Sequence, residues 1–169
     1  MLSMMINLDE SKDRWLRVAG RLNELGLVFK RISAVNGRML MDKEIEALTY
    51  PLDHFETKVR FTRNLTRGEI GCFLSHRKCW EALVESGEKC AIVMEDDIRI
   101  SSLAALYMKN DEWLPSECDI CQLSSLGEKI KGRVKEKKFE IANGVEIVQP
   151  VSPAPLGTQC YIISAFAAK

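Results

Sequence analysis

The sequence predicts an α/β fold with a mostly parallel central sheet and an added β-hairpin, and three observations support this. The first 32 residues alternate strand, helix and strand, which is the repeating unit of a parallel sheet. A helical segment that starts at Thr66 leads directly into the continuously apolar residues 90–94, as expected for a strand buried on both faces. Asn143-Gly144 lies between two β-type segments, a pattern typical of a hairpin turn.

The opening unit follows from hydrophobic spacing. Residues 4–8 are an apolar run that predicts a short strand, and residues 28–32 predict a second one. Between them, Gly26 offers a helix stop. The apolar residues at helical spacing before it are Trp15, Val18, Ala19, Leu22 and Leu25. Residues 34–37 are then expected to form a turn.

The central segment contains the clearest helix. Residues 38–65 are less regular, and we expect a weak helix at 41–48 followed by a long loop or short helices over a sheet edge. Thr66 and Glu69 have the spacing of a capping box, in which each side chain bonds the other residue's backbone N–H. Gly87 closes the helix. Its expected apolar face consists of Ile70, Phe73, Leu74, Trp80, Leu83 and Val84.

Three acids, Glu95-Asp96-Asp97, directly follow the apolar strand at 90–94. The exit of a buried parallel strand lies in the crevice beyond the carboxyl ends of the strands, where open α/β sheets bind ligands. Carboxylate oxygens there can hold Mg²⁺ or Mn²⁺, which usually also bind substrate phosphates. Acidic triplets also decorate solvent-exposed turns, so the pattern alone leaves both interpretations open.

The last third has a different character. Residues 139–142 and 145–148 are the predicted hairpin strands, and residues 159–163 predict a last strand. Ser164 then begins a helix cap and one turn of helix formers, which is not stable alone. We therefore expect a fragment or truncated product. Apolar surface around residues 161–163 should then be exposed in a single copy of the chain and be covered by self-association.

Composition bounds the function. A chain of 169 residues can build one core, so a single domain over residues 1–169 is expected. Lys plus Arg and Asp plus Glu are both 24, and a net charge of zero argues against a nucleic-acid partner. With no long apolar run and no positively charged leader, a cytoplasmic protein is expected. The basic run at 129–138 is expected to be a solvated face; the alternative is that it attracts a phosphorylated glycan or the inner membrane surface.

The six cysteines do not suggest a disulfide framework. Cys118 and Cys121 form a lone C-x-x-C, and a short strand there would point the thiols to opposite faces, which argues against a zinc or redox pair. The cysteines in apolar segments, expected to be buried and reduced, are Cys72, Cys79, Cys90 and Cys160.

Several stretches, which cover essentially the whole chain, resemble a known family. They are I-N-L-D-E-S-K-D-R at 6–14, F-K-R-I-S-A-V-N-G at 29–37, G-E-I-G-C-F-L-S-H at 68–76 with Trp80, V-M-E-D-D at 93–97 and G-T-Q-C-Y-I-I-S at 157–164. Their order and spacing resemble glycosyltransferase family 25, the bacterial lipooligosaccharide galactosyltransferases and their relatives that glycosylate collagen. Members of this family usually continue past the point where this chain stops.

The resemblance implies a GT-A-like nucleotide-binding fold and transfer of a sugar, often galactose, from a UDP-sugar to a lipooligosaccharide or other glycan acceptor. The acidic triplet would be the family's DxD-like element and would hold Mn²⁺ or Mg²⁺. Asp97 is then the first predicted metal ligand, and Glu95 or Asp96 would make a second metal or ribose contact. A cation at a strand end stabilises the charge that develops on the departing UDP.

The other predicted site residues come from the same resemblance. They are His76 and Asp96 as catalytic residues, and Asn7, Leu8, Arg14, Ala34 and Thr158 as substrate-binding residues. Each has a structural alternative: Arg14 as a solvated helix cation, His76 as a packed, hydrogen-bonded residue, Thr158 as a turn hydroxyl. Asn7 and Leu8 are equally well explained as an ordinary strand end with no contact to a ligand. No general base for an inverting transfer is identified. The rival functions are a non-catalytic nucleotide-sugar-binding fragment and a metal-dependent phosphohydrolase.

Overall fold

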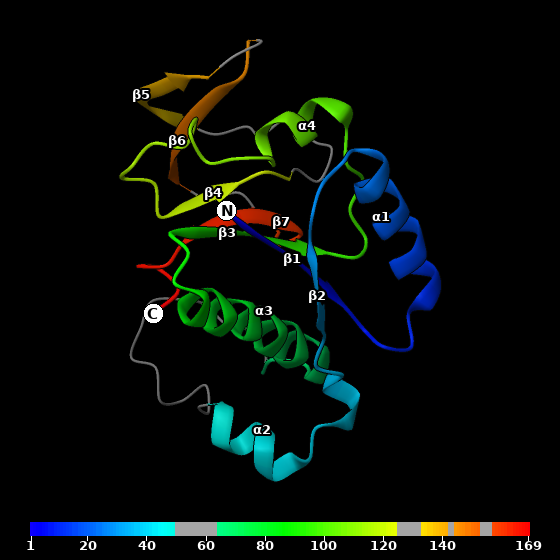
Figure 1. Cartoon of the computed structure of the whole chain (residues 1–169). Helices are drawn as coiled ribbons and strands as arrows, with labels where there is room; N and C mark the ends of the chain where they lie inside the picture. Colours follow the sequence, from blue (N-terminus) through cyan, green and yellow to red (C-terminus); the bar gives the residue numbers. More distant parts are fainter. Residues whose placement is uncertain (50–63, 125–132, 142–143, 153–156) are drawn as a thin grey trace.

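The computed structural model of the chain describes residues 1–49, 64–124, 133–141, 144–152 and 157–169. Figure 1 shows a central sheet with α3 on one side and α1 and α4 on the other. In chain order the elements are β1 (Leu2–Asn7), α1 (Lys12–Glu24), β2 (Lys30–Ser33), η1 (Gly37–Met39), α2 (Asp42–Leu48), α3 (Arg67–Ser86), β3 (Cys90–Glu95), α4 (Ser102–Tyr107), β4 (Ile120–Gln122), β5 (Arg133–Glu140), β6 (Glu146–Ser152) and β7 (Cys160–Ser164).

The central sheet has five strands in the order β2-β1-β3-β7-β4. β1 pairs in parallel with both β2 and β3, so the predicted strand–helix–strand opening is confirmed. β7 runs antiparallel to β3 and to β4, which makes it the one strand of this sheet that points the other way. The prediction of a mostly parallel sheet is therefore confirmed. The carboxyl ends of β1, β2 and β3 meet at one edge, where the polar residues that follow them converge.

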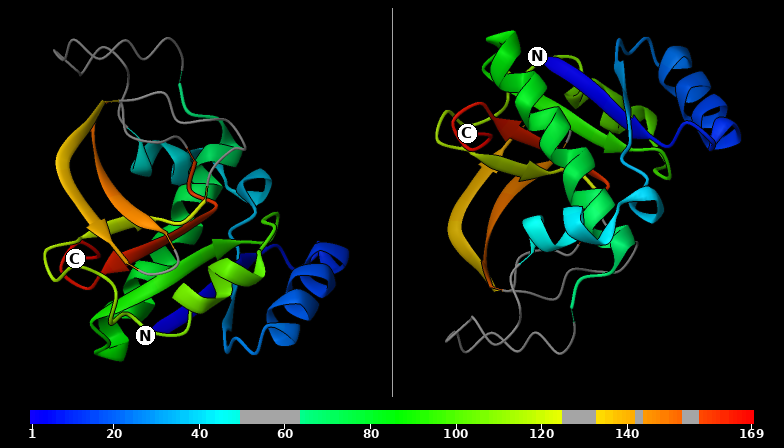
Figure 2. Two further views of the ribbon diagram at one scale, coloured as in Figure 1. Left: turned by 90° about the horizontal axis from the view of Figure 1, so that it is seen from above. Right: turned by 90° about the horizontal axis from the view of Figure 1, so that it is seen from below.

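The sheet is covered on both faces, which explains why β3 is apolar without interruption. Successive residues of a strand point to opposite faces. On one face, Met5 and Ile92 pack with Leu22 of α1 and Ala105 of α4. On the other face, Met4, Val93 and Ile163 pack with Cys79 and Leu83 of α3. Figure 2 shows these two layers from above and below the view of Figure 1.

Helix α3 starts and ends as predicted. The Thr66 hydroxyl accepts a hydrogen bond from the Glu69 backbone N–H at 3.2 Å, and the Glu69 carboxylate accepts one from the Thr66 N–H at 2.7 Å. This is the predicted capping box. Gly87 ends the helix with a φ of 72°, a left-handed conformation that favours glycine.

The predicted apolar face of α3 was wrong in part. Phe73 is 52% exposed and Val84 is 37% exposed. Phe73 instead packs edge-on against the Trp80 ring on the outside of the helix, with ring centroids 5.9 Å apart. The buried side is narrower and more polar than hydrophobicity alone suggested, and it consists of Ile70, Gly71, Ser75, His76, Cys79 and Leu83.

Small residues allow α3 to lie almost in contact with the backbone of the loop after β2. A Cβ atom on Gly71 would lie 2.7 Å from the Gly37 nitrogen and the Val35 oxygen. Real Cβ atoms essentially never come so close, so only glycine fits at this position. The Val35 N–H donates to the Ser75 hydroxyl at 2.8 Å, which joins the same two segments.

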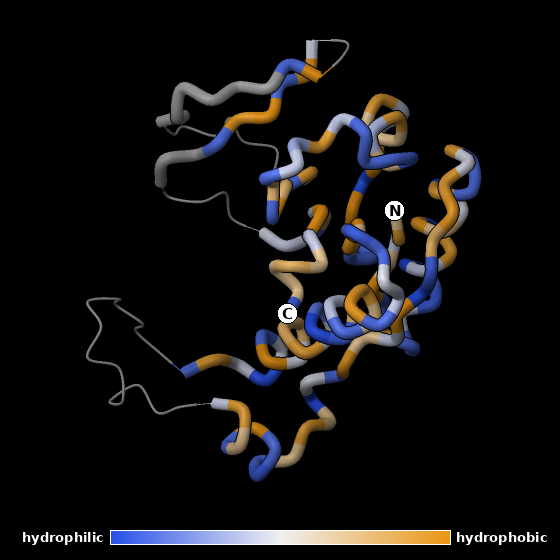
Figure 3. Tube along the Cα trace, turned by 60° about the vertical axis from the view of Figure 1, so that its left-hand side comes forward, coloured by the Kyte–Doolittle hydropathy of each residue, from blue (hydrophilic) through white to orange (hydrophobic). Residues whose placement is uncertain are grey.

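The hairpin forms as a separate two-stranded sheet of β5 and β6. Its strands are longer than predicted, and Gly144 in the turn has a φ of 72°. Asn143 lies outside the described residues. Of the basic run at 129–138, residues 129–132 also lie outside them, and the side chains of residues 133–138 are not described. Hydrophobic and hydrophilic residues alternate along the helices in Figure 3, as expected for elements with one buried side.

The C-terminal strand is better covered than predicted. Tyr161, Ile162 and Ile163 are 7%, 1% and 3% exposed, because Ile162 packs into the core on one face of the sheet and Tyr161 and Ile163 pack into the core on the other. The predicted apolar surface for self-association is therefore absent at these residues. Beyond β7 the chain forms a turn in which the Ser164 hydroxyl accepts from the Ala167 N–H at 3.1 Å. In the described part of the chain, no helix has the length and apolar character needed to cross a membrane.

The cysteines are all free, but two expectations about them were wrong. Cys72 is exposed, because it lies on the side of α3 that faces the cleft described below and not the sheet. Cys118 precedes β4, in a turn where its N–H bonds the Pro115 carbonyl, so strand alternation does not apply to it. Its thiol instead donates to the Ile120 backbone carbonyl at 3.5 Å.

Candidate functional site

A cleft of about 420 Å³ opens at the carboxyl ends of the parallel strands. Its floor is formed by the ends of β1 and β3, and its walls by the start of α1, the loop after β2 and the first half of α3. The polar and charged residues that line it are Asn7, Glu10, Ser11, Arg14, Asn36, Arg38, Ser75, His76, Glu95 and Asp96, with Cys72 beside them. The location is the one predicted from the acidic triplet.

Asp96 is the buried centre of the floor. It is 5% exposed, and its two carboxylate oxygens have separate partners. The Asn7 side-chain amide donates to one oxygen at 2.6 Å, and the Arg14 guanidinium forms an ion pair with the other at 3.0 Å. Arg17 donates to the Asp96 backbone carbonyl at 3.1 Å. A buried carboxylate needs such partners, and here they hold the Arg14 side chain at the cleft.

Asn7 connects this centre to β2. Its side-chain oxygen accepts two hydrogen bonds from Arg31, at 2.6 and 3.0 Å. Arg31 also forms an ion pair with Asp9 at 2.8 Å, and the Ser33 hydroxyl donates to the same carboxylate at 2.8 Å. These bonds with Ser33 and Arg31 hold the pKa of Asp9 below its usual range. The ends of β1 and β2 are therefore fixed together by polar side chains.

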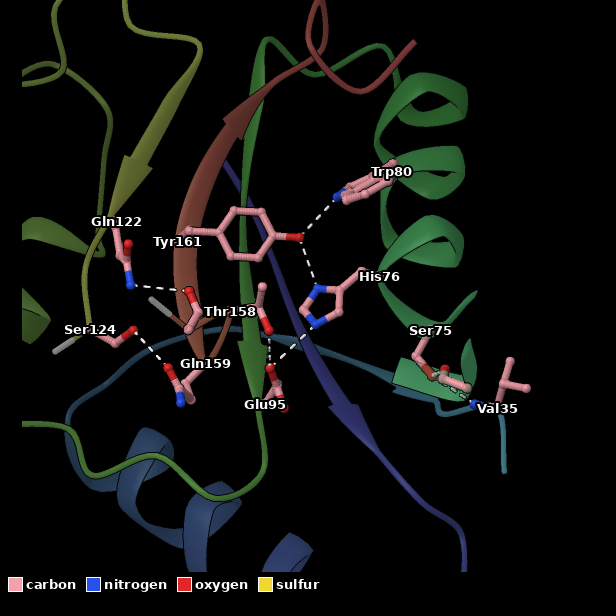
Figure 4. A network of polar contacts seen from close by, with 12 residues as sticks. Val35, Ser75, His76, Trp80, Glu95, Gln122, Ser124, Thr158, Gln159 and Tyr161 are labelled. Carbon is pink, nitrogen blue, oxygen red and sulfur yellow. Dashed lines mark hydrogen bonds and ion pairs between the residues drawn. The ribbon is translucent and has the colours of Figure 1, made fainter. Parts of the chain in front are cut away.

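Glu95, at the end of β3, belongs to a second network that includes residues of α3 and β7 (Figure 4). Its carboxylate accepts a hydrogen bond from the Thr158 hydroxyl at 2.7 Å and lies 3.3 Å from Nε2 of His76. The other ring nitrogen of His76, Nδ1, lies 2.9 Å from the Tyr161 hydroxyl. The Trp80 indole N–H donates to that same hydroxyl at 2.9 Å. The network thus ties α3 to β3 and β7.

This network shifts the ionisation of its members in opposite directions. Burial by itself would lower the pKa of His76, but hydrogen bonds with Cys72 and Glu95 outweigh it and raise that pKa to about 9. The same bond with His76 is the main reason why the pKa of Glu95 is lowered. The contact between His76 and Glu95 thus favours the charged form of each residue.

Asp97 differs from its two neighbours. Its side chain is exposed and does not line the cleft floor. Desolvation, followed by the negative charges of Glu95 and Asp96, raises its pKa. Repulsion of this kind is relieved when a cation binds among the carboxylates.

The predicted site residues are largely brought together. The residues that line the cleft are Asn7, Leu8, Arg14, Ala34, His76, Glu95 and Asp96. Thr158 contacts the cleft only through its bond to Glu95, and Asp97 lies beside the cleft. The roles assigned to these residues stay predictions.

Several participants were not predicted. Arg31 and Tyr161 carry no local signal, because their partners are far away in the sequence. Arg31, Ser75 and Tyr161 do lie within the stretches that resemble the family, and this was the one available hint. Cys72 was read as a core residue because it lies in an apolar run.

The donor set permits a hard divalent cation at the acidic triplet. Mg²⁺ and Mn²⁺ sites commonly use one or two carboxylates, with substrate phosphates and water as the remaining ligands. Asp97 and the oxygen of Glu95 that does not face His76 can supply two. Asp96 is less suited, because both its oxygens already have partners. The residues present thus fit such an ion through Asp97 and Glu95.

The fold is that of an α/β protein with a mostly parallel sheet, and its cleft lies at the carboxyl ends of the parallel strands, where open α/β sheets bind ligands. Comparison with known sequences makes this specific. The model of glycosyltransferase family 25, described as an LPS biosynthesis protein family, matches residues 1–169. The chain belongs to this family of glycosyltransferases, and the predicted relationship is confirmed.

Its relatives include animal proteins. It is 39% identical over 106 residues to procollagen galactosyltransferase 1 of Danio rerio, a match that covers 63% of this chain and 18% of the relative. It is 32% identical over 149 residues to procollagen galactosyltransferase 2 of Homo sapiens, covering 86% of this chain and 23% of the relative. A Bos taurus protein named probable inactive glycosyltransferase 25 family member 3 is 37% identical over 98 residues, covering 58% and 16%. The chain spans about a fifth of the length of the relatives it matches.

Proposed function

We propose that this chain is the donor-binding part of a metal-dependent glycosyltransferase that transfers a sugar, galactose, from a UDP-sugar to a glycan acceptor. The observation that carries the proposal is the match to the family over residues 1–169, combined with a cleft at the strand ends that gathers the predicted residues. Two of the relatives are named galactosyltransferases, which supports galactose as the sugar.

The cleft supplies positive charge where a nucleoside diphosphate would lie. Arg14 is 44% exposed on its side chain, so it remains accessible to a ligand while Asp96 holds it in place. Arg38, in η1 after β2, adds a second guanidinium to the lining of the same cleft. Guanidinium groups recognise phosphates through paired hydrogen bonds, and preorganised donors favour the charge that develops on the leaving diphosphate. We therefore assign diphosphate binding to Arg14 and Arg38.

Asp97 and Glu95 are proposed to hold Mn²⁺ or Mg²⁺, which when bound would offset the charge of the diphosphate. His76 holds Glu95 through its Nε2–H, and Thr158 holds the same carboxylate from β7. Because both ring nitrogens of His76 have partners, its proposed contribution is to orient Glu95. Asp96 likewise is proposed to orient the Arg14 guanidinium through their ion pair. The two residues predicted as catalytic are thus proposed to position others.

The acceptor is proposed to be a lipooligosaccharide-type glycan, which agrees with the family's description. The relatives' names point to procollagen instead, so both acceptors belong in the transfer assay. A cytoplasmic location, contact with the inner membrane surface and homo-oligomers stay predictions for the whole protein. Fractionation of cells and light scattering of the purified chain would test them.

A second candidate is a nucleotide-sugar-binding part without transfer activity of its own. The name of the Bos taurus relative and the fraction of the relatives' length that is matched favour it. Both candidates require the same donor site and differ only in turnover. A metal-dependent phosphohydrolase would instead release phosphate from UDP or other phosphoesters.

Calorimetry with UDP, with and without Mn²⁺, tests the donor site. We expect Mn²⁺-dependent binding that weakens roughly tenfold or more in Asp97→Asn, because even the loss of a residue that only supports a metal ligand costs that much. Glu85→Gln removes an exposed carboxylate of α3 outside the cleft and should leave the affinity unchanged. Absence of Mn²⁺-dependent UDP binding would refute the proposal. Sugar transfer to a truncated oligosaccharide or a collagen peptide then separates the enzyme from the binding fragment.

A further inference from the structure

Cys72, His76 and Glu95 form a compact group of three different ligand types. Cys72 and His76 are four residues apart on α3 and therefore lie on the same side of the helix, one turn apart. Glu95, at the end of β3, faces them across the cleft wall. The thiol sulfur, a ring nitrogen and a carboxylate oxygen all lie within 4.8 Å of one another. Within the described residues no other group of three such side chains is this close.

The chemistry of this group differs from that of the acidic triplet. Zinc is bound by cysteine sulfur, histidine nitrogen and carboxylate oxygen, and sites with three protein ligands keep a fourth position open. Thiolate and imidazole ligands favour Zn²⁺ and similar soft or borderline ions, whereas Mg²⁺ and Mn²⁺ favour oxygen. The donor set therefore selects a different class of cation from the one proposed for Asp97.

The surroundings are those of a supported metal site. A metal-bound histidine usually has a hydrogen-bond partner at its other ring nitrogen, which fixes the ring. Here Tyr161 lies 2.9 Å from Nδ1 of His76, and Trp80 fixes the Tyr161 hydroxyl in turn. Thr158 fixes the Glu95 carboxylate. Figure 4 shows the imidazole held between Tyr161 and Glu95.

The group is also accessible. Cys72 is exposed and all three residues line the cleft, so an ion can enter from solvent. His76 is 4% exposed, which keeps its ring in one place. The open fourth position would face the cleft and could hold water.

We propose that Cys72, His76 and Glu95 bind one zinc-type divalent cation at the wall of the cleft. On binding, the Cys72 thiol and Nε2 of His76 each release a proton to solvent, and sulfur and nitrogen donate their electron pairs to the ion. Binding of the ion does not depend on the proposed function. One consequence does rest on it: zinc at this site would occupy Glu95 and so oppose Mn²⁺-supported UDP binding.

Cobalt replaces zinc in such sites and reports its ligands by absorbance. Titration of the whole reduced chain with Co²⁺ should give a thiolate-to-cobalt charge-transfer band that saturates at one ion per chain and disappears when Zn²⁺ is added. Cys72→Ser should abolish this band and weaken Zn²⁺ binding by at least the roughly 10- to 100-fold that loss of a supporting residue costs. Glu95→Gln should weaken binding while keeping the band. Cys121→Ser, which removes a thiol of the C-x-x-C pair instead, should change neither.

Two results would overturn the proposal. One is the absence of a charge-transfer band in the unmodified chain. The other is a band that persists in Cys72→Ser and is lost in Cys121→Ser, which would place the ion at the C-x-x-C pair. Thermal melts of each variant in EDTA show whether it is folded, and Glu95→Gln tests the site independently of the cysteine. Mn²⁺-dependent UDP calorimetry without zinc reports on the proposed function separately.

Discussion

Replacing Gly71 by alanine tests how closely α3 is packed against the loop that walls the cleft. The added Cβ would lie 2.7 Å from the Gly37 nitrogen and the Val35 oxygen, and 2.9 Å from the Gly37 Cα. These are all backbone atoms, so they cannot rotate away as a side chain can. Gly20→Ala in α1 is the matched control, because a Cβ there has nothing within 4 Å.

The magnitude follows from two opposing effects. Replacing a helical glycine by alanine stabilises a helix by about 0.8–1.0 kcal/mol, and this gain is common to both variants. Overpacking at Gly71 costs about 1–3 kcal/mol, so its net effect lies between about zero and 2 kcal/mol of destabilisation. The difference in unfolding free energy between the two variants, about 1–3 kcal/mol, therefore isolates the steric cost. For a chain of this size the corresponding gap in Tm is about 2–12 °C.

Urea unfolding and thermal melts measure both variants. Gly20→Ala should raise Tm, and Gly71→Ala should fall below it by the stated gap. Since the Val35–Gly37 loop forms a wall of the cleft, UDP affinity should weaken in Gly71→Ala and stay unchanged in Gly20→Ala. If both alanines stabilise the protein equally, the close approach of α3 to this loop does not exist in solution and the reasoning fails.

Three further predictions concern stability. Thr66→Ala should destabilise the chain by about 1 kcal/mol in urea unfolding, because α3 loses its N-cap, whereas Thr66→Ser should not. Asn7→Ala should cost about 2–4 kcal/mol, because one oxygen of the buried Asp96 carboxylate loses its donor while Arg14 stays on the other; a loss under about 1 kcal/mol would show that water replaces the amide. The loss of unfolding free energy in Glu95→Gln, measured in EDTA, should be largest between about pH 4.5 and 6.5. The lowered pKa of Glu95 contributes stability at pH values above its ordinary pKa of 4.5, and this contribution is lost as the pH falls. The raised pKa of His76 contributes stability at pH values below its ordinary pKa of 6.5, and this contribution is lost as the pH rises to about 9. If the stability difference between Glu95→Gln and the unmodified chain does not vary with pH, this reasoning is contradicted.

The elements that could be predicted are those determined by neighbours in the chain. The capping box of Thr66 and Glu69, the glycine stop at Gly87 and the apolar run of β3 each depend on a few consecutive residues. The location of the acidic triplet was predictable for a related reason: in a parallel sheet, the exits of the strands meet at one edge whatever the details of packing.

The roles within the triplet were decided by tertiary structure. Asp96 is paired with Asn7, which lies 89 residues away, and Glu95 with Thr158, 63 residues away. No local pattern contains these pairings, because they depend on the order of strands in the sheet. Three consecutive acids that look equivalent in the sequence thus differ in the structure: Asp96 is buried, Glu95 is held by hydrogen bonds and Asp97 is exposed.

The same division applies to α3. By itself, the sequence determined that residues 67–86 form a helix, where it starts and where it ends, because hydrogen bonds and caps are local. Only the tertiary structure decided which side is buried. The tight approach of the loop at Gly37 selects Gly71 and Ser75 for the interior, Phe73 is left outside, and Cys72 is turned toward the cleft. Hydrophobic spacing shows which residues share a side of a helix, but the surface against which the helix packs decides which side that is.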